Sequence, residues 1–409
     1  MLVFVVLVAL VAFVVYRGTT PEQRQQFLEE VVQPAAARVD ALLAETEPYR
    51  ATLRTRTPRL IATPVLAGLN VLMFLAMLFG NGSFDSAATL IDWGANHGPR
   101  TTNGEWWRLL TAVFLHGGPF HLLCVLIGLV QVAELVERLV GGPVVAGVFL
   151  IAGTLASLVS VVDHPLAIHV GASAGLCGLF GLLLAITGWS ALRPGAVMIP
   201  LAVYKTLLPA TAVFFLYAVI TDGIGNRPNL TGLMVGMTAG VAVMAIAGER
   251  KLGARPYAVG MAFAVVLMLW IAWPLRNIVD VRPNLIELVA NDDRQTTVFR
   301  MVVDRFQSRQ VPIDRQRVAT LIEQTFVPQV ADARRRVEEL RPTLRDQQPL
   351  VAKAAEYARL REQSWRLRAE GLKSSRIGVL READRAEMAA RAALDTLRTV
   401  EATTVTIHR

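Results

Sequence analysis

Long apolar runs separated by short polar stretches dominate the first 275 residues of the chain. Seven of these runs are close to the length of about 20 residues that a helix needs to cross the hydrocarbon core of a bilayer. They cover residues 60–80, 109–136, 143–162, 171–189, 199–220, 230–247 and 257–275. The strict alternation that membrane β-strands require is absent. The pattern therefore predicts an all-α, polytopic membrane protein.

The flanking segments differ from these runs in length or in charge. Residues 1–16 are almost wholly apolar and lack a cleavage site, which predicts an uncleaved N-terminal membrane anchor. Residues 17–59 combine charge with helical apolar spacing, as in a cytoplasmic helical linker. We expect a six-helix core at 60–248, one additional membrane helix at 256–275, and a soluble, charged helical tail at 276–409.

Cations mark alternate ends of the predicted membrane helices. Because cytoplasmic loops carry an excess of Lys and Arg, the ends that hold these cations are predicted to be cytoplasmic. They are Arg54, Arg56, Arg59, Arg138, Arg193, Arg250, Lys251 and Arg255. The opposite ends hold Asp85, Asp92, Asp163 and Asp222. This assignment places the start of the 171–189 helix, and the tail after residue 275, outside the cytoplasm.

Composition narrows the classes of function. The chain is 53% hydrophobic, which excludes an ordinary soluble domain, and its net charge of +8 fits arginines in cytoplasmic loops. We therefore expect the lipid bilayer as a partner and no nucleic acid. Cys124 and Cys177 lie within apolar runs and are interpreted as small buried hydrophobes. The sequence shows no metal-spaced or phosphate-binding motif, so we expect no metal and no cofactor.

Candidate chemistry concentrates at the start of the 171–189 run. Here Gly171-Ala172-Ser173-Ala174-Gly175-Leu176-Cys177-Gly178 places one hydroxyl among small residues. Small residues spaced four apart let membrane helices approach closely, which is one explanation of the pattern. The other is that Ser173 is a nucleophile, which requires a general base and donors for an oxyanion elsewhere in the chain.

Other segments resemble a known family. Residues 104–118, GEWWRLLTAVFLHGG, followed by His121, are similar to the second-helix signature of the rhomboid intramembrane serine proteases. The stretch from Gly171 resembles their nucleophile helix, with Ala174 where glycine is usual. Gly232, Gly236 and Gly240 reproduce the spacing of the sixth-helix glycines. The resemblance covers about residues 60–247 and implies a six-helix rhomboid-like core. The apolar runs outside this range add one extra membrane helix on each side of the core.

The resemblance also implies a Ser–His dyad, and here the chain departs from the pattern. Ser173 occupies the nucleophile position, but the position three residues before Gly232, where the family has histidine, holds Asn229. An asparagine amide cannot accept a proton at neutral pH. His121 is retained at an oxyanion position, whereas the second oxyanion position, an asparagine in the family, is Val125.

A replacement base could come from His169, four residues before Ser173, if the backbone were helical from residue 169. Three hypotheses follow. The first is a catalytically impaired pseudoprotease that binds transmembrane client proteins between the second and fifth core helices. The second is an active intramembrane serine endopeptidase that uses Ser173 with a non-standard base. The third is a membrane-anchored scaffold that acts through protein partners of its tail. We expect a multi-pass protein of a bacterial inner or plasma membrane.

Overall fold

The computed structural model describes residues 20–80, 83–84, 86–193, 198–222, 226–247, 252–308, 314–340 and 347–404. The predicted membrane anchor at 1–16 lies outside these residues. The described chain forms two compact units, of which the first ends at Arg276 and the second begins at Asn277. Each unit has its own hydrophobic core.

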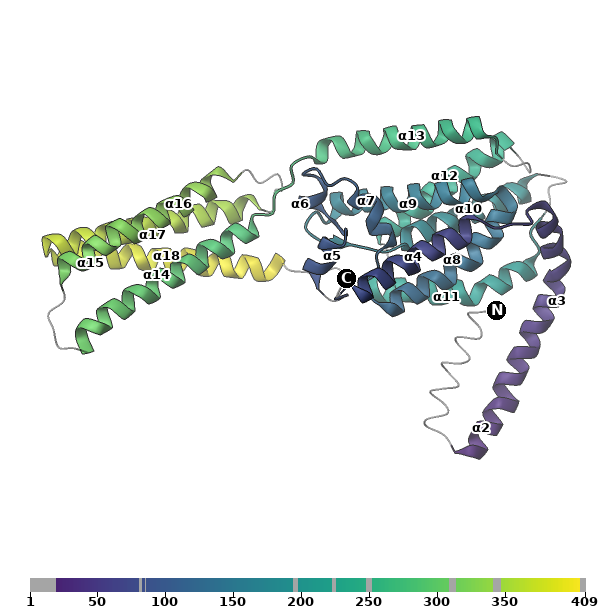
Figure 1. Ribbon diagram of the computed structural model, residues 1–409, viewed down its shortest axis with the longest axis horizontal. Coiled ribbons are helices and arrows are strands. Elements are labelled where there is room, and N and C mark those ends of the chain that lie inside the picture. The colour runs from purple at the N-terminus through teal and green to yellow at the C-terminus, as the bar shows by residue number, and fades with distance from the viewer. Residues whose placement is uncertain are drawn as a thin grey trace. The chain divides into compact units, whose positions relative to one another are not determined.

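Among the described residues, seven helices of the first unit are long and apolar enough to cross a membrane. They are α4 (Ala62–Phe79), α8 (Pro119–Val140), α9 (Gly142–Asp163), α10 (Ser173–Leu192), α11 (Leu201–Asp222), α12 (Arg227–Ala247) and α13 (Ala254–Ala272). The 3₁₀ turn η3 (Trp273–Leu275) extends the last one. The prediction of an all-α polytopic membrane protein is confirmed (Figure 1).

Short elements connect α4 to α8. They are α5 (Ala87–Asp92), β1 (Asn96–His97), α6 (Gly98–Thr101), α7 (Arg108–Thr111) and the 3₁₀ turn η2 (Ala112–Phe114). The predicted membrane helix at 109–136 is therefore wrong at its start, because α8 begins only at Pro119. Gly118 has a φ of 151° and Pro119 occupies the first turn of α8, so no helix continues through this point.

A two-residue antiparallel pairing joins this region to the connection between α9 and α10. β1 pairs with β2 (Ile168–His169), with Asn96 opposite His169 and His97 opposite Ile168. The N–H of Gly98 also donates to the carbonyl of Pro165 at 3.0 Å. The pairing fixes the chain that leads into α10.

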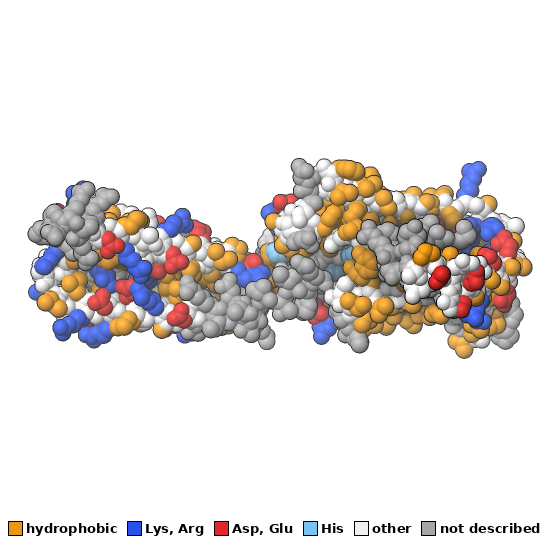
Figure 2. All heavy atoms as spheres, turned by 90° about the horizontal axis from the view of Figure 1, so that it is seen from below, with side chains coloured by type: hydrophobic (Ala, Val, Ile, Leu, Met, Phe, Trp, Pro, Cys, Tyr) orange, Lys and Arg blue, Asp and Glu red, His pale blue; other side chains and the backbone are white. Residues whose placement is uncertain are grey.

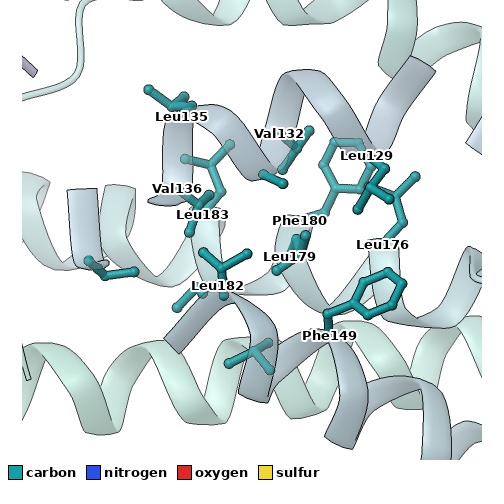
Figure 3. Packing of buried hydrophobic residues seen from close by; sticks show 14 of the residues in the cluster. Leu129, Val132, Leu135, Val136, Phe149, Leu176, Leu179, Phe180, Leu182 and Leu183 are labelled. Carbon is teal, nitrogen blue, oxygen red and sulfur yellow. The ribbon is translucent and has the colours of Figure 1, made fainter. Parts of the chain in front are cut away.

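Side chains of α8, α9 and α10 form the centre of the first unit (Figure 3). Leu129, Val132, Phe149, Leu176 and Leu182 are among the buried members of this cluster. Of the most apolar 18 residues of each span, 72% are buried in α9 but only 11% in α13. Helix α9 is thus central, and α13 is peripheral with most of its apolar surface exposed. In a bilayer, lipid chains cover such surface.

The two units have different surfaces (Figure 2). Orange apolar side chains cover much of the first unit, whereas the second mixes Lys and Arg with Asp and Glu among fewer apolar groups. The exposed apolar residues of the first unit include Phe79, Ile220 and Trp270. Large apolar surface of this kind is stable only in lipid or against another protein. Together with the seven spans, it makes the protein an integral membrane protein with several crossings.

Before α4, the chain forms α2 (Pro21–Phe27), the π-helix η1 (Leu28–Val32) and α3 (Gln33–Arg56), which packs against α11 and α8. The second unit contains α14 (Arg282–Ser308), α15 (Arg315–Leu321), the π-helix η4 (Ile322–Phe326), α16 (Val327–Glu339), α17 (Gln348–Ser374) and α18 (Ile377–Thr404). Tyr357 and Trp365 of α17 are almost fully buried, so the charged tail folds around a core.

Candidate functional site

Ser173 is the first residue of α10, and its side chain is buried, with 9% of the residue exposed. The turn before it requires glycine, since Gly171 has a φ of 124°, which residues with a side chain rarely adopt. The N–H of Gly171 donates to the carbonyl of Ala112 at 2.9 Å. This backbone contact fixes the turn that leads into Ser173.

Helices α10 and α12 meet through glycines. A Cβ atom on Gly232 would lie 2.1 Å from the carbonyl oxygen of Ala174, and one on Gly240 would lie 2.6 Å from the Cβ of Ala185. Between these two positions, Gly236 contacts the backbone of Gly178. Only an absent side chain allows this approach. Gly175, by contrast, faces α9, where the ring of Phe149 contacts it.

Asn229 lies in the first turn of α12, three residues before Gly232. The contact of Gly232 with Ala174 brings this turn beside the start of α10, where Ser173 precedes Ala174. The Oδ1 atom of Asn229 is buried and accepts no hydrogen bond within the described part of the chain. Asn229 thus places an amide, rather than an imidazole, within one helical turn of the α10–α12 contact.

His121, in the first turn of α8, is the imidazole that lies beside Gly171. A Cβ atom on Gly171 would be 2.7 Å from Cε1 of His121, 3.0 Å from its Nε2 and 3.9 Å from Oγ of Ser173. The imidazole and the hydroxyl thus lie on the same turn. No hydrogen bond joins them among the described residues. His121 also contacts the ring of Tyr217 of α11, with 5.3 Å between ring centroids.

Val125 is fully buried one turn after His121 and belongs to the hydrophobic core. Its isopropyl group cannot donate a hydrogen bond, so this position supplies nothing to a developing oxyanion. It serves packing between the helices instead.

His169 was a candidate base only if the backbone were helical from residue 169, and this condition is not met. It lies in β2, opposite Asn96, and α10 begins only at Ser173. The helical path from residue 169 to the hydroxyl is absent. Burial lowers the pKa of His169 to about 4, so its ring is neutral at pH 7.

His116 and Tyr217 complete the surroundings of His121. His116 is fully buried, neither of its ring nitrogens has a partner among the described residues, and its ring meets His121 edge-on at 4.9 Å between centroids. Sequence reasoning missed Tyr217, because its contact with His121 joins two helices far apart in the chain and leaves no local pattern. Among the described residues, no group of three or more His, Cys, Asp or Glu could hold a metal ion.

Comparison with known proteins finds relatives of the segment that holds these residues. The family model of the rhomboid domain matches residues 103–246, a range that contains Ser173, Asn229 and His121. The chain is similar to the rhomboid protease GluP of Bacillus subtilis, with 37% identity over 122 residues, which are 30% of this chain and 24% of GluP. It is 30% identical over 164 residues to the mitochondrial RHOMBOID-like protein 6 of Arabidopsis thaliana, covering 38% of this chain and 50% of that protein.

A third relative is rhomboid-like protease 1 of Toxoplasma gondii, 29% identical over 160 residues, with 38% of this chain and 53% of the relative covered. The chain therefore spans between about a quarter and about half of the length of these three relatives. The matched segment holds α8 to α12 and the turn at Gly171. On the domain match and these similarities, the chain carries a rhomboid domain at residues 103–246.

Proposed function

We propose that this rhomboid-family protein is a catalytically impaired pseudoprotease that binds transmembrane client proteins. The observation that carries the proposal is Asn229, an amide at the position where the family places its general base. Its buried Oδ1 accepts no hydrogen bond among the described residues, including from Ser173.

The expected loss of activity follows from chemistry. Peptide hydrolysis by a serine needs a group that removes the hydroxyl proton, and a positioned base contributes about 10²–10⁴-fold. Val125 removes one donor for the oxyanion, and such a donor contributes about 10²–10³-fold in other serine proteases. Either change alone would make peptide cleavage slow.

Client binding is supported by the contact between α8 and α11. Phe120 and His121 of α8 both contact the ring of Tyr217 of α11, with 5.6 Å and 5.3 Å between ring centroids. Phe120 is 61% exposed, so the contact reaches the lipid-facing surface. Only 28% of the most apolar stretch of α11 is buried. An apolar helix that separates these rings would reach the turn that holds Ser173.

A second candidate function is an active intramembrane serine endopeptidase in which His121 acts as the displaced base. The observation in its favour is the position of the His121 ring, which lies beside Gly171 together with the Ser173 hydroxyl. In this case Ser173 would be activated without a histidine on α12.

Labelling with a serine-directed fluorophosphonate distinguishes the pseudoprotease from the active endopeptidase. A pseudoprotease leaves Ser173 unlabelled, whereas Asn229→His combined with Val125→Asn should introduce labelling that Ser173→Ala abolishes. Labelling of the unaltered protein that is lost in both Ser173→Ala and His121→Gln would instead establish the endopeptidase.

Binding is tested with a photo-crosslinking residue at Phe120 and a single-span model client. The same residue at Val259 of α13 is the control.

We also propose a bacterial inner membrane as the location, with the second unit outside the cytoplasm. A relative from Bacillus subtilis supports a bacterial setting, and the distribution of cations along the chain supports the orientation. We further propose that the second unit, which folds around a core that includes Trp365, binds protein partners. Protease added to right-side-out cells should digest the second unit. Complete protection would contradict the orientation.

A further inference from the structure

One face of α3 docks on the helix bundle of the first unit. Thr46, Tyr49, Leu53 and Thr57 recur at helical spacing, and each is buried or packed against the core. Leu53 is only 3% exposed and belongs to the main hydrophobic cluster. The rhomboid domain match begins at residue 103, so this docked helix lies outside the matched domain.

The end of α3 is bound to both α8 and α11. Arg50 donates from Nη2 to Oγ1 of Thr206 on α11 at 3.0 Å. Thr206 donates its own proton to the carbonyl of Val203 at 2.7 Å, so its oxygen faces Arg50 as the acceptor. On α8, Arg138 donates from Nη1 to the carbonyl of Thr57 at 2.9 Å, and the Thr57 hydroxyl donates to the carbonyl of Arg138 at 3.2 Å. Hydrogen bonds from arginines thus join α3 to each of the two helices.

At the opposite end, near Ser173, α8 and α11 meet through aromatic rings. The rings of Phe120 and His121 lie 5.6 Å and 5.3 Å from the ring of Tyr217, measured between centroids. A contact between rings is weaker than a hydrogen bond that involves a charged group. We call the two ends of this helix pair the α3 end and the Ser173 end. These contacts hold the α3 end more firmly than the Ser173 end.

Pro209 divides α11 into two halves. Proline has no N–H group, so the helix lacks the hydrogen bond that an amide at this position would donate. A helix bends most readily at such a point. Residues 201–208, which include Thr206, belong to the α3 end, and residues 210–222, which include Tyr217, belong to the Ser173 end. The second half can therefore move while the first half stays in place.

We propose that α3 is a strap that holds α8 and α11 together at the α3 end, so that the two helices separate only at the Ser173 end, with Pro209 as the hinge. The inference rests on the proposed client binding for one point, namely that α8 and α11 separate to admit a client. It adds where they separate and which segment of the chain sets that limit. A client helix then reaches the turn at Ser173 without opening the bundle from end to end.

The test is hydrogen exchange of the α11 amides in the full chain in neutral detergent, without any client. Residues 201–208 should exchange more slowly than residues 210–222, because the strap restricts only the first half. Arg50→Gln and Thr206→Val should each speed exchange in 201–208 at least about tenfold, the value of one hydrogen bond to a charged group, and leave 210–222 unchanged. Arg54→Gln, which changes an exposed arginine of the same helix, is the matched control.

Two further measurements distinguish the strap from a general folding defect and from client binding. The double variant Arg50→Gln/Thr206→Val should lose no more protection than either single variant, because both substitutions remove the same contact. Adding the single-span model client should change exchange only in residues 210–222. If the client changes nothing while the substitutions act as expected, client binding is contradicted and the strap stands. Equal exchange in both halves of α11 in the unaltered protein, or an equal effect of Arg54→Gln, would overturn the strap.

Discussion

A Cβ atom on Gly236 would lie 1.8 Å from the carbonyl oxygen of Gly178, a separation that no real side chain could occupy. Backbone therefore touches backbone where α12 crosses α10. Helix association in lipid depends on such packing, because lipid chains are as apolar as the side chains they replace. This contact, rather than hydrophobic burial, holds Asn229 near Ser173.

Gly236→Ala should therefore separate α10 from α12. We expect a loss of about 1–3 kcal/mol or more in the free energy of unfolding, as for other additions of atoms to a packed core. Thermal unfolding in detergent measures the effect. Gly68→Ala in α4 is the matched control, since nothing lies within 4 Å of a Cβ at that position. Equal behaviour of the two variants would contradict the proposed contact.

Glu137 supports the start of α4. It is buried, and its carboxylate accepts hydrogen bonds from the N–H of Ile61 at 2.7 Å, of Ala62 at 2.9 Å and of Thr63 at 2.7 Å, and from the Thr63 hydroxyl. The negative charge also lies where the helix dipole favours it.

Glu137→Gln replaces an acceptor oxygen with an N–H₂ group that faces other donors. We expect a loss of about 2–4 kcal/mol in unfolding free energy, since hydrogen bonds to charged groups are worth about 1.5–3 kcal/mol each. Glu134→Gln, which changes an exposed partner of Arg138 one turn earlier, should cost less than about 1 kcal/mol. Chemical denaturation of both variants measures the difference. A smaller loss for Glu137→Gln than for Glu134→Gln would refute the capping role.

His169 makes stability depend on pH. Its folded pKa is lowered by burial to about 4, against an ordinary value of about 6.5, so the unfolded chain binds more protons between these two values. The contribution of His169 to stability is therefore complete above about pH 6.5 and is lost as the pH falls towards 4. Unfolding temperatures recorded from pH 7 to pH 4 should fall less steeply for His169→Gln than for the unaltered protein. Parallel curves would show that His169 does not contribute.

The ion pairs of Arg361 are expected to stabilise the second unit. It is buried, forms ion pairs with Asp292 and Glu387, and donates to the Thr296 hydroxyl at 2.7 Å. Arg361→Gln leaves the half-buried Asp292 without its cation and removes one of the arginines around Glu387, which keeps Arg368, and should cost about 3 kcal/mol. Arg391→Gln removes an exposed partner of the same Glu387 and should cost less than about 1 kcal/mol. Hydrogen exchange of the second unit in the full chain distinguishes the two, and similar protection in both variants would contradict this assignment.

The membrane helices were predictable because an apolar run of fixed length has few alternatives in a lipid environment. Most of the observed helices begin and end within a few residues of the predicted runs. The error at α8 has a local cause. Residues 109–115 are apolar enough to extend a membrane helix, and only the Gly117-Gly118-Pro119 sequence signals the break.

The roles of the candidate site residues stay predictions, and the contacts between these residues could not be predicted from the sequence. Motif spacing identified the positions of Ser173 and Asn229. The approach of the His121 ring to Gly171 depends on how α8 and α10 pack, and no spacing along the chain encodes it. In the second unit, the burial of Trp365 was not predicted. Apolar residues there occur singly among arginines and glutamates, so the sequence shows no apolar run that marks a core.

The pairing of β1 with β2 has a consequence for biosynthesis. Asn96 leaves the ribosome before α8 and α9 have been made, and its partner His169 emerges only after both. β1 therefore stays unpaired while α8 and α9 insert into the membrane. The surroundings of Ser173 are completed late in translation, and a chain truncated after α9 would leave the first strand without a partner.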